Sequence, residues 1–370
     1  MSEKDVIFIC LSNVREMDWL SGTILLLEKN FDVVLVGLYS SQSVFEKAIP
    51  KTNSKKHFID FQGPRQILSG SISMLTCLLH HRPRVVLSHG LYASLFSTLL
   101  SWSIPGCKVI SVRHHGYGNA KMKKLRFLDF LVNKFADRHI AISKLTEVLL
   151  ISEKVPSKKI TYVPNAIPNV EFRGNMQKKV NEEIDFRKRL NIKDTAFLVG
   201  AASRFVHWKG VEYTINAFRE FSLVVDNSHL LLINALGYSQ EIKNALSSLD
   251  PKRFTLIEEL EDIEIFYNSL DVFVHVPVSP TSEPFGLVYL EALISGVPCI
   301  FTRSGVLIEM SETFPNVFFV DYRSENEIFL SLVSCHKLGS HFVKRLLPLR
   351  YTLEQNSQKT LELIKETLEI

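Results

Sequence analysis

The stretch Ser282-Glu283-Pro284-Phe285-Gly286-Leu287-Val288-Tyr289-Leu290-Glu291-Ala292 is the most informative part of this chain. It follows the apolar run Asp271 to Val276, which predicts a buried strand. It opens an apolar segment that ends at Gly296, the residue type that commonly ends a helix. The pattern therefore predicts a strand, a loop and a helix N-terminus with a glutamate on either side of that N-terminus.

This placement is typical of a ligand site. In an open α/β sheet, ligands bind outside the carboxyl ends of the strands, and the unpaired amide groups of a first helical turn favour an anion. We expect Glu283 in the loop and Glu291 inside the helix, roughly 6 Å along the axis from Leu287, with its side chain leaning back toward the N-terminus. A nucleotide sugar, with an anionic part for the amides and hydroxyls for the carboxylates, suits this geometry.

Length and composition favour a soluble protein of two domains. At 370 residues the chain exceeds the usual size of one core, and 46% apolar with 22% charged residues is ordinary for a globular protein. Lys and Arg number 43 against 39 Asp and Glu, a balance too even to indicate a nucleic-acid partner. The five cysteines form no C-x-x-C pair, which indicates reduced residues in the cytoplasm.

No segment indicates export or membrane insertion. The residues before the apolar run Val6 to Cys10 are too few and too acidic for a signal peptide. The longest apolar run, Leu91 to Ile104, falls short of the ~20 residues that span a bilayer. We therefore expect a cytoplasmic protein, with peripheral contact at the inner face of a membrane as the one membrane association to consider.

Both halves of the chain alternate strand-like runs with segments of helical spacing, such as 14–28 and 119–135. In the first half the runs are 6–10, 33–36, 85–87, 109–112, 140–142 and 160–163. In the second half they are 197–200, 230–233, 254–257, 272–276, 299–301 and 317–320. This βαβ repetition predicts a doubly wound, mostly parallel sheet in each half.

The boundary between the two halves is predicted by composition. The polar stretch Gly174 to Glu183 is the best linker candidate in the chain. We expect an N-terminal Rossmann-like domain at 1–168 for the acceptor and a C-terminal one at 169–351 for the donor. An amphipathic helix at 352–370 would follow and pack back toward the N-terminal domain.

The motif Glu283-Pro284-Phe285-Gly286-Leu287, with Glu291-Ala292 and Gly296-Val297-Pro298 after it, resembles the E-x7-E signature of glycosyltransferase family 4. These are retaining nucleotide-sugar enzymes with the GT-B fold, in which two Rossmann-like domains face each other across a cleft. The segment Gly200 to Gly210 is similar to the family's basic loop, and partial matches occur at 163–166 and 351–354. The first half resembles the family mostly by topology.

Arg204 and Lys209 within that loop can be interpreted from chemistry alone. A departing nucleoside diphosphate gains negative charge in the transition state, which a catalyst must stabilise. The sequence contains no D-x-D pair to hold a divalent ion, so side-chain cations and helix dipoles are left as stabilisers. We expect both cations at the crevice of Glu283, against the alternative of two solvated loop residues.

The resemblance implies roles for the remaining site residues. It implies that Glu291 binds the ribose hydroxyls and that Glu283 holds donor-sugar hydroxyls near the developing oxocarbenium ion. It implies that the amides of Phe285, Gly286 and Leu287 contact sugar and phosphate. The alternative for Glu291 is a carboxylate paired with an arginine inside a largely buried helix.

In the first half, the resemblance implies that a histidine after the strand Lys108 to Val112 contacts the donor sugar. His114 and His115 are both candidates, and only one of them is expected to face the sugar, because adjacent residues rarely point the same way. For the same reason, we do not expect the two histidines to hold a metal together. The alternative is a histidine satisfied within its loop. His89, at another strand end, is a weaker candidate.

Two features depart from the family or add to it. The first strand runs into Leu11-Ser12-Asn13-Val14-Arg15 instead of a glycine-rich loop, which makes the acceptor pocket unusual. The segment 119–135 carries Lys121, Lys123, Lys124, Arg126 and Lys134 among apolar residues. This basic amphipathic pattern is compatible with an anionic membrane surface and equally with a helix that packs on the sheet.

We therefore expect a retaining hexosyltransferase that needs no metal and no cofactor. It would move a sugar from a nucleoside diphosphate, UDP in preference to GDP, to a hydroxyl of a glycan or lipid-linked glycan. A catalytically silent sugar-binding subunit is one alternative. A nicotinamide-dependent oxidoreductase is another, suggested by Gly116-Tyr117-Gly118, although the fingerprint lacks its third glycine.

Overall fold

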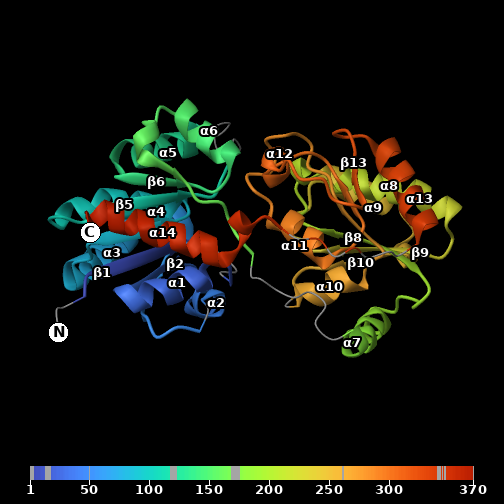
Figure 1. Ribbon diagram of the computed structural model, residues 1–370, viewed down its shortest axis with the longest axis horizontal. Helices are drawn as coiled ribbons and strands as arrows, with labels where there is room; N and C mark the ends of the chain where they lie inside the picture. Colours follow the sequence, from blue (N-terminus) through green and yellow to red (C-terminus); the bar gives the residue numbers. More distant parts are fainter. Residues whose placement is uncertain are drawn as a thin grey trace. The chain divides into compact units, whose positions relative to one another are not determined.

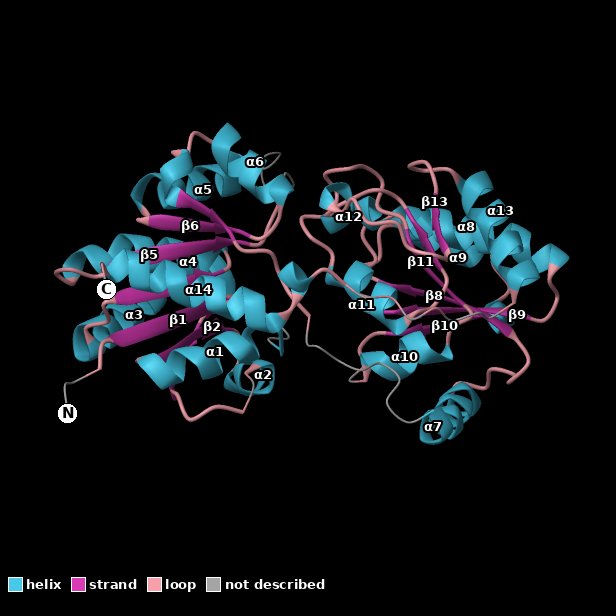
Figure 2. Ribbon diagram, in the orientation of Figure 1, coloured by secondary structure: helices cyan, strands magenta, loops and turns pink. Residues whose placement is uncertain are grey.

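The structure, a computed structural model, describes residues 4–12, 18–49, 51–116, 123–167, 176–260, 262–339, 343, 345 and 347–369 (Figure 1). The chain divides into two compact units. The first consists of Met1–Asn169 and Pro348–Ile370, and the second of Val170–Leu347. Each unit contains one parallel sheet flanked by helices (Figure 2), so the predicted α/β class is confirmed.

The first unit has a seven-stranded sheet in the order β3-β2-β1-β4-β5-β6-β7. Its strands are β1 (Val6–Ser12), β2 (Asp32–Tyr39), β3 (Lys55–Asp60), β4 (Val85–His89), β5 (Lys108–Arg113), β6 (Arg138–Ala141) and β7 (Ile160–Tyr162). Because β1 pairs with both β2 and β4, the chain reverses its direction of travel across the sheet between β1 and β4. This is a topological switch point, where ligands commonly bind.

The helices of the first unit are α1 (Asp18–Asn30), α2 (Gln42–Ala48), α3 (Ile67–His81), α4 (Leu91–Leu100), α5 (Lys123–Phe135), α6 (Lys144–Ser152) and α14 (Leu353–Leu368). The terminal helix α14, red in Figure 1, packs against α1. Asn356 donates to the carbonyl of Pro164 at 2.7 Å, and Thr23 shares a hydrogen bond with Ser357 at 3.2 Å. A Cβ at Gly22 would lie 2.9 Å from Ser357 Oγ, so glycine allows this close approach.

The second unit has a six-stranded sheet in the order β10-β9-β8-β11-β12-β13. Its strands are β8 (Phe197–Ala202), β9 (Ser228–Ile233), β10 (Phe254–Ile257), β11 (Val272–His275), β12 (Cys299–Phe301) and β13 (Val317–Phe319). Its helices are α7 (Met176–Arg189), α8 (Val211–Val224), α9 (Gln240–Ser247), α10 (Ile263–Ser269), α11 (Leu287–Ser295), α12 (Val306–Glu309) and α13 (Glu325–Leu338). The switch point of this sheet lies between β8 and β11.

The cores of both units are built from the predicted runs. In the second unit, Val199, Phe218, Val274 and Ile300 are fully buried in one apolar cluster. Burial of such side chains contributes about 1.5–3 kcal/mol each relative to exposure. Each sheet is therefore a rigid base that fixes the loops at the carboxyl ends of its strands.

The strands predicted from β-branched runs are all present, and the structure adds β3. This strand was not predicted because it reads Lys-Lys-His-Phe-Ile-Asp and lies at the sheet edge, where a polar face is tolerated. The predicted helices at 14–28 and 119–135 are found as α1 and α5, while 14–17 and 119–122 lie outside the described residues.

The predicted linker at 174–183 is wrong from residue 176 onward, because Met176–Arg189 forms α7. The helix is anchored near its end by buried Phe186 and by Arg187, which donates to the carbonyl of Ser269 and to Asp271. Good helix formers make a polar helix locally favourable, and these two anchors fix it to the unit. Gly174 and Asn175 lie outside the described residues.

Candidate active site

The switch point of the second unit brings together two loops that are far apart in the sequence. β8 and β11 are neighbours in the sheet, and the chain leaves both at the same edge. The loop after β8 carries Arg204 and Lys209, and the loop after β11 carries Glu283. The parallel topology alone therefore places these three residues at one end of one sheet.

Glu283 is the centre of this arrangement. Its side chain is buried and forms an ion pair with the ammonium of Lys209, which is also largely buried. His275, the last residue of β11, contacts the same carboxylate through Nε2 at 3.2 Å. Burial opposes ionisation of Glu283, but Lys209 and His275 outweigh it and lower the pKa of this carboxyl to about 2. Glu283 is therefore negative at any physiological pH.

Burial lowers the pKa of His275 more than the neighbouring Glu283 raises it. The imidazole is consequently neutral at neutral pH, and its Nε2–H can donate to the carboxylate. The ring packs edge-on against Tyr289 with centroids 4.8 Å apart, which fixes its orientation. Glu283 thus has a fixed position between a cationic donor and a neutral one.

Two glycines let the backbone close around Glu283. Gly286 has φ +83°, and a Cβ there would lie 2.8 Å from Glu283 Cγ and 2.6 Å from the Tyr289 ring. Gly305 has φ +55°, and a Cβ there would lie 2.3 Å from the carbonyl oxygen of Phe285. Any other residue would strain the backbone and displace the loop. The amide of Glu283 also donates to Ser304 Oγ at 3.2 Å.

The N-terminus of α11 adds a second feature to the site. Gly286 precedes the helix, and no side chain of the described residues caps it there. Phe285 is buried, and its carbonyl accepts from the amide of Val306 at 2.8 Å. The predicted segment Phe285, Gly286 and Leu287 therefore leads directly into the first turn, whose amide groups and dipole favour an anion.

Glu291 lies on α11 and is half-buried. The hydroxyl of Tyr267, a fully buried residue of α10, donates to Glu291 Oε2 at 2.9 Å. Burial, with Glu291 beside it, raises the pKa of Tyr267 well above its ordinary value, so the phenol keeps its proton. The contact with Tyr267 was not predicted, and it orients the carboxylate without neutralising it.

Arg204 and Lys209 differ in their surroundings. Lys209 ends a short 3-10 helix, His207–Lys209, and the amide of Val278 donates to the carbonyl of the adjacent Trp208 at 3.2 Å. The loop after β8 is thereby tied to the loop after β11. Arg204 lies in the same loop, but its side chain is exposed. The structure brings Lys209 to Glu283 and leaves the guanidinium of Arg204 in solvent.

In the first unit, His114 lies at the end of β5, next to His89 at the end of β4. Their rings are joined by a hydrogen bond of 2.9 Å between His89 Nδ1 and His114 Nε2. Trp19 packs against both rings, with centroid distances of 5.3 and 5.2 Å. Burial, then the nearby His115, lowers the pKa of His114 to about 4, so this ring is neutral.

His115 points to a different partner. Its Nε2 contacts Asp129 at 2.8 Å, and the same carboxylate pairs with buried Arg113 at 2.5 Å. Arg113 also pairs with Glu153 of the segment after α6 at 2.7 Å. His115 therefore belongs to a buried ion-pair network beside α5. His114 instead lies at the carboxyl ends of β4 and β5, where a ligand can bind.

His275 and Tyr267 were not predicted as site residues from the sequence, and His89 was predicted only as a weaker candidate. The signal for His275 was present, because it ends the buried run Val-Phe-Val-His immediately before the loop of Glu283. Tyr267 gave no signal, since only the packing of α10 on α11 brings it to Glu291. Tyr117 and Gly118 of the oxidoreductase alternative, and residues 13–15 of the altered first loop, lie outside the described residues.

Two family models match the chain. The model described as glycosyl transferases group 1 matches residues 182–329, and the glycosyltransferase family 4 model matches residues 25–169. Each match falls on one of the two parallel sheets. Together the two models account for most of both units.

Curated relatives are glycosyltransferases that this chain covers only in part. An uncharacterized glycosyltransferase of Methanocaldococcus jannaschii is 25% identical over 210 residues, 56% of this chain and 52% of that protein. An O-antigen biosynthesis glycosyltransferase of Escherichia coli is 24% identical over 199 residues, 50% of this chain and 54% of that protein. The chain thus spans about half the length of these relatives.

Solved structures extend the likeness over the whole chain at the level of fold. HepE of Anabaena, crystallised with UDP and glucose, has a TM-score of 0.79 at 16% identity and covers 98% of this chain and 100% of its own. The crystal structure of HepE with UDP-glucose has a TM-score of 0.75 at the same identity and coverage. Its two parallel-sheet units match the GT-B fold of these structures, and in its matches to both models the chain resembles the family 4 glycosyltransferases.

Proposed function

We propose that this protein is a retaining, metal-independent hexosyltransferase. It takes a sugar from a nucleoside diphosphate, UDP in preference to GDP, and transfers it to a hydroxyl of a glycan or lipid-linked glycan. The observation that carries the proposal is the buried pair of Lys209 and Glu283 at the β8–β11 switch point. The O-antigen relative and the HepE complexes with UDP support the classes of acceptor and donor.

The diphosphate of the donor binds at the start of α11. The first-turn amides and the helix dipole favour its charge, and Lys209 lies beside them through its contact with Glu283. As the bond to the sugar breaks, the growing charge on the diphosphate is stabilised by Lys209 and by Arg204, which can move because it is exposed. Together these two cations take the part that a bound divalent ion plays elsewhere.

Glu283 holds hydroxyls of the donor sugar and places negative charge near the anomeric carbon. Its carboxylate remains ionised because its pKa is about 2. Such a charge stabilises an oxocarbenium-like transition state, in which the sugar becomes positive as the diphosphate leaves. The acceptor hydroxyl attacks from the face that the diphosphate leaves, and a phosphate oxygen takes its proton, which gives retention.

Glu291 binds the ribose hydroxyls of the nucleotide. The carboxylate accepts a hydrogen bond from the hydroxyl of Tyr267, which orients it on α11. Its place on the same helix as the diphosphate amides fixes the distance between the two halves of the nucleotide. In the first unit, His114 is neutral and held by His89 and Trp19, and its ring is the proposed hydrogen-bond partner for a sugar.

Contact of the basic surface of α5 with a membrane would bring the protein to a lipid-linked acceptor. Helix α5 exposes Lys123, Lys124 and Arg126 together with Phe127 and Phe130, which are 59% and 53% exposed. A cavity of about 620 Å³ between α5 and α6 is lined by Arg126, Lys134, Lys154 and Lys159, among others. Cations beside exposed aromatic rings are typical of an interfacial contact with anionic lipid. None of the described helices is long and apolar enough to cross a bilayer.

Replacement of Lys209 by Met should slow sugar transfer by at least about tenfold, because the departing diphosphate loses a fixed cation. The measurement is the transfer rate under saturating donor and acceptor. Lys243→Met, on the exposed surface of α9 in the same unit, is the matched control and should keep the wild-type rate. Equal rates in Lys209→Met and wild type would place the active centre elsewhere.

Replacement of Glu291 by Ala should weaken nucleotide binding by roughly tenfold or more, since hydrogen bonds to a charged group contribute about 1.5–3 kcal/mol. Titration calorimetry with UDP, GDP and ADP measures this and identifies the base. The control is Glu241→Ala, which removes an exposed carboxylate on α9. Unchanged affinity for every nucleotide in Glu291→Ala would remove the proposed ribose contact.

His114 and His115 should separate in their effects. His114→Ala should reduce the turnover of transfer and leave the melting temperature close to that of the wild type. His115→Ala should lower the melting temperature, because Asp129 loses a partner in a buried network, and should reduce turnover less. Kinetics and thermal melts of both variants measure the difference. The opposite pattern would assign the sugar contact to His115.

Charge reversal on α5 should abolish membrane binding. The double variant Lys123→Glu, Lys124→Glu should no longer float with liposomes that contain anionic lipid, because the surface attraction is lost. Lys243→Glu, Lys252→Glu makes the same charge change on the exposed surface of the second unit and should float like the wild type. Failure of the wild-type protein to float with anionic liposomes would contradict the proposed membrane contact.

A further inference from the structure

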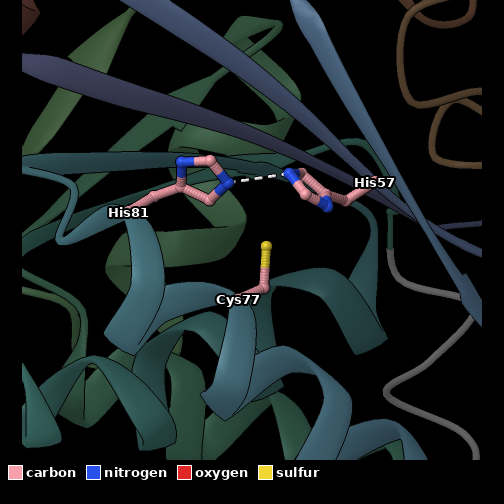
Figure 3. Close-up of side chains that lie close together, drawn as sticks. All are labelled: His57, Cys77 and His81. Atoms are coloured by element: carbon pink, nitrogen blue, oxygen red, sulfur yellow. Dashed lines mark hydrogen bonds between the residues drawn. The ribbon is translucent and has the colours of Figure 1, made fainter.

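Three side chains of types that bind transition metals meet at one edge of the first unit. His57 lies on the edge strand β3, while Cys77 and His81 lie four residues apart on α3. This spacing places Cys77 and His81 on one face of the helix. Figure 3 shows the sulfur of Cys77 pointing toward the space between the two imidazole rings.

The ligand atoms are already close to one another. The Nε2 atoms of His57 and His81 are 2.7 Å apart. One ring nitrogen of each histidine and Cys77 Sγ all lie within 4.8 Å of one another. A tetrahedral zinc ion with Zn–N of 2.0–2.1 Å and Zn–S of 2.3 Å needs its ligand atoms roughly 3.3–3.6 Å apart. The two histidine nitrogens are therefore closer together than zinc requires, so the rings must separate for an ion to bind between them.

The surroundings hold these groups in place and keep them available as ligands. Phe8 of β1 packs edge-on against the His81 ring at 5.6 Å, and the His57 and His81 rings meet edge-on at 4.7 Å. Burial, together with neighbouring His80 and Lys55, lowers the pKa of His57, and burial likewise lowers that of His81. Neutral imidazoles have the free lone pair that a metal requires.

We propose that His57, Cys77 and His81 bind one zinc ion, with solvent in the fourth position. Two nitrogens and one sulfur are a ligand set that suits Zn²⁺. Cys77 binds as the thiolate, and its proton passes to solvent as the Zn–S bond forms. Burial raises the pKa of this thiol to about 11, and the charge of the bound ion offsets this cost.

The ion would act as a structural link between β3 and α3. β3 is the edge strand and pairs only with β2 among the described strands, so it has fewer neighbours than the inner strands. β2 and β1 separate it from β4, which carries His89. The zinc site is therefore distinct from the proposed sugar site, and the transfer reaction remains metal-independent.

Zinc uptake by the full-length protein tests the proposal. Native mass spectrometry and competition against a chromophoric chelator should give one Zn²⁺ per chain, and Zn²⁺ should raise the melting temperature. Co²⁺ in place of zinc should produce a thiolate-to-cobalt charge-transfer band in the near ultraviolet. No uptake by the wild type would show that His57 and His81 share only a hydrogen bond, and would leave the proposed sugar transfer untouched.

Variants assign the ligands. His57→Ala and His81→Ala should abolish uptake, and Cys77→Ala should remove the cobalt charge-transfer band. His80→Ala, next to a proposed ligand, and Cys107→Ala, a partly exposed cysteine outside the group, are matched controls that should keep both signals. If His57→Ala unfolds, His57→Gln takes its place in the test, because glutamine retains a hydrogen-bonding side chain. A charge-transfer band that survives in Cys77→Ala, or that disappears in His80→Ala, would overturn the assignment.

Discussion

The buried ion pair between Lys209 and Glu283 constrains the second unit more than any other contact of its site. Two charges removed from water must stay together, because loss of one partner leaves an uncompensated buried charge at a cost of about 3–5 kcal/mol. The loop after β8 and the loop after β11 are therefore held at a fixed separation. His275 adds a neutral donor, so the carboxylate keeps both its charge and its direction. A site for a transition state with separated charges needs this kind of fixed polarity.

The same constraint explains the backbone around the pair. A buried carboxylate needs close packing on all sides, and the chain provides it with glycines where side chains would collide. Gly286 and Gly305 both have positive φ. A Cβ on Gly286 would lie 2.8 Å from Glu283 Cγ, and a Cβ on Gly305 would lie 2.3 Å from the carbonyl oxygen of Phe285. The glycine in the signature motif thus has two functions, because it starts α11 and also leaves room for the carboxylate that precedes it. In this chain the spacing of the motif therefore reflects packing as well as chemistry.

Much of this could be predicted from the sequence, and the exceptions have physical causes. Buried strands are apolar and β-branched, so runs such as 85–87 and 272–276 predicted strands of the two parallel sheets. The edge strand β3 and the polar helix α7 were not predicted, because few of their described side chains are buried and their sequences resemble loops. Lys209 and Glu283 were predicted by motif, whereas Tyr267 was not, because its contact with Glu291 depends on how two helices pack. The sequence could not show that His114 and His115 contact different partners, because the directions of their side chains depend on the backbone after β5.

The position of α14 determines the order in which the two units can be completed. The first unit includes Pro348–Ile370, so the whole second unit is an insertion between its sheet and its last helix. A chain that leaves the ribosome N-terminus first has all of the second unit available before Asn356 and Ser357 can reach Pro164 and Thr23. The second unit can therefore fold early, while the surface beside α1 stays uncovered until α14 has been synthesised. Helix α14 thus completes the first unit only after the whole second unit has been made.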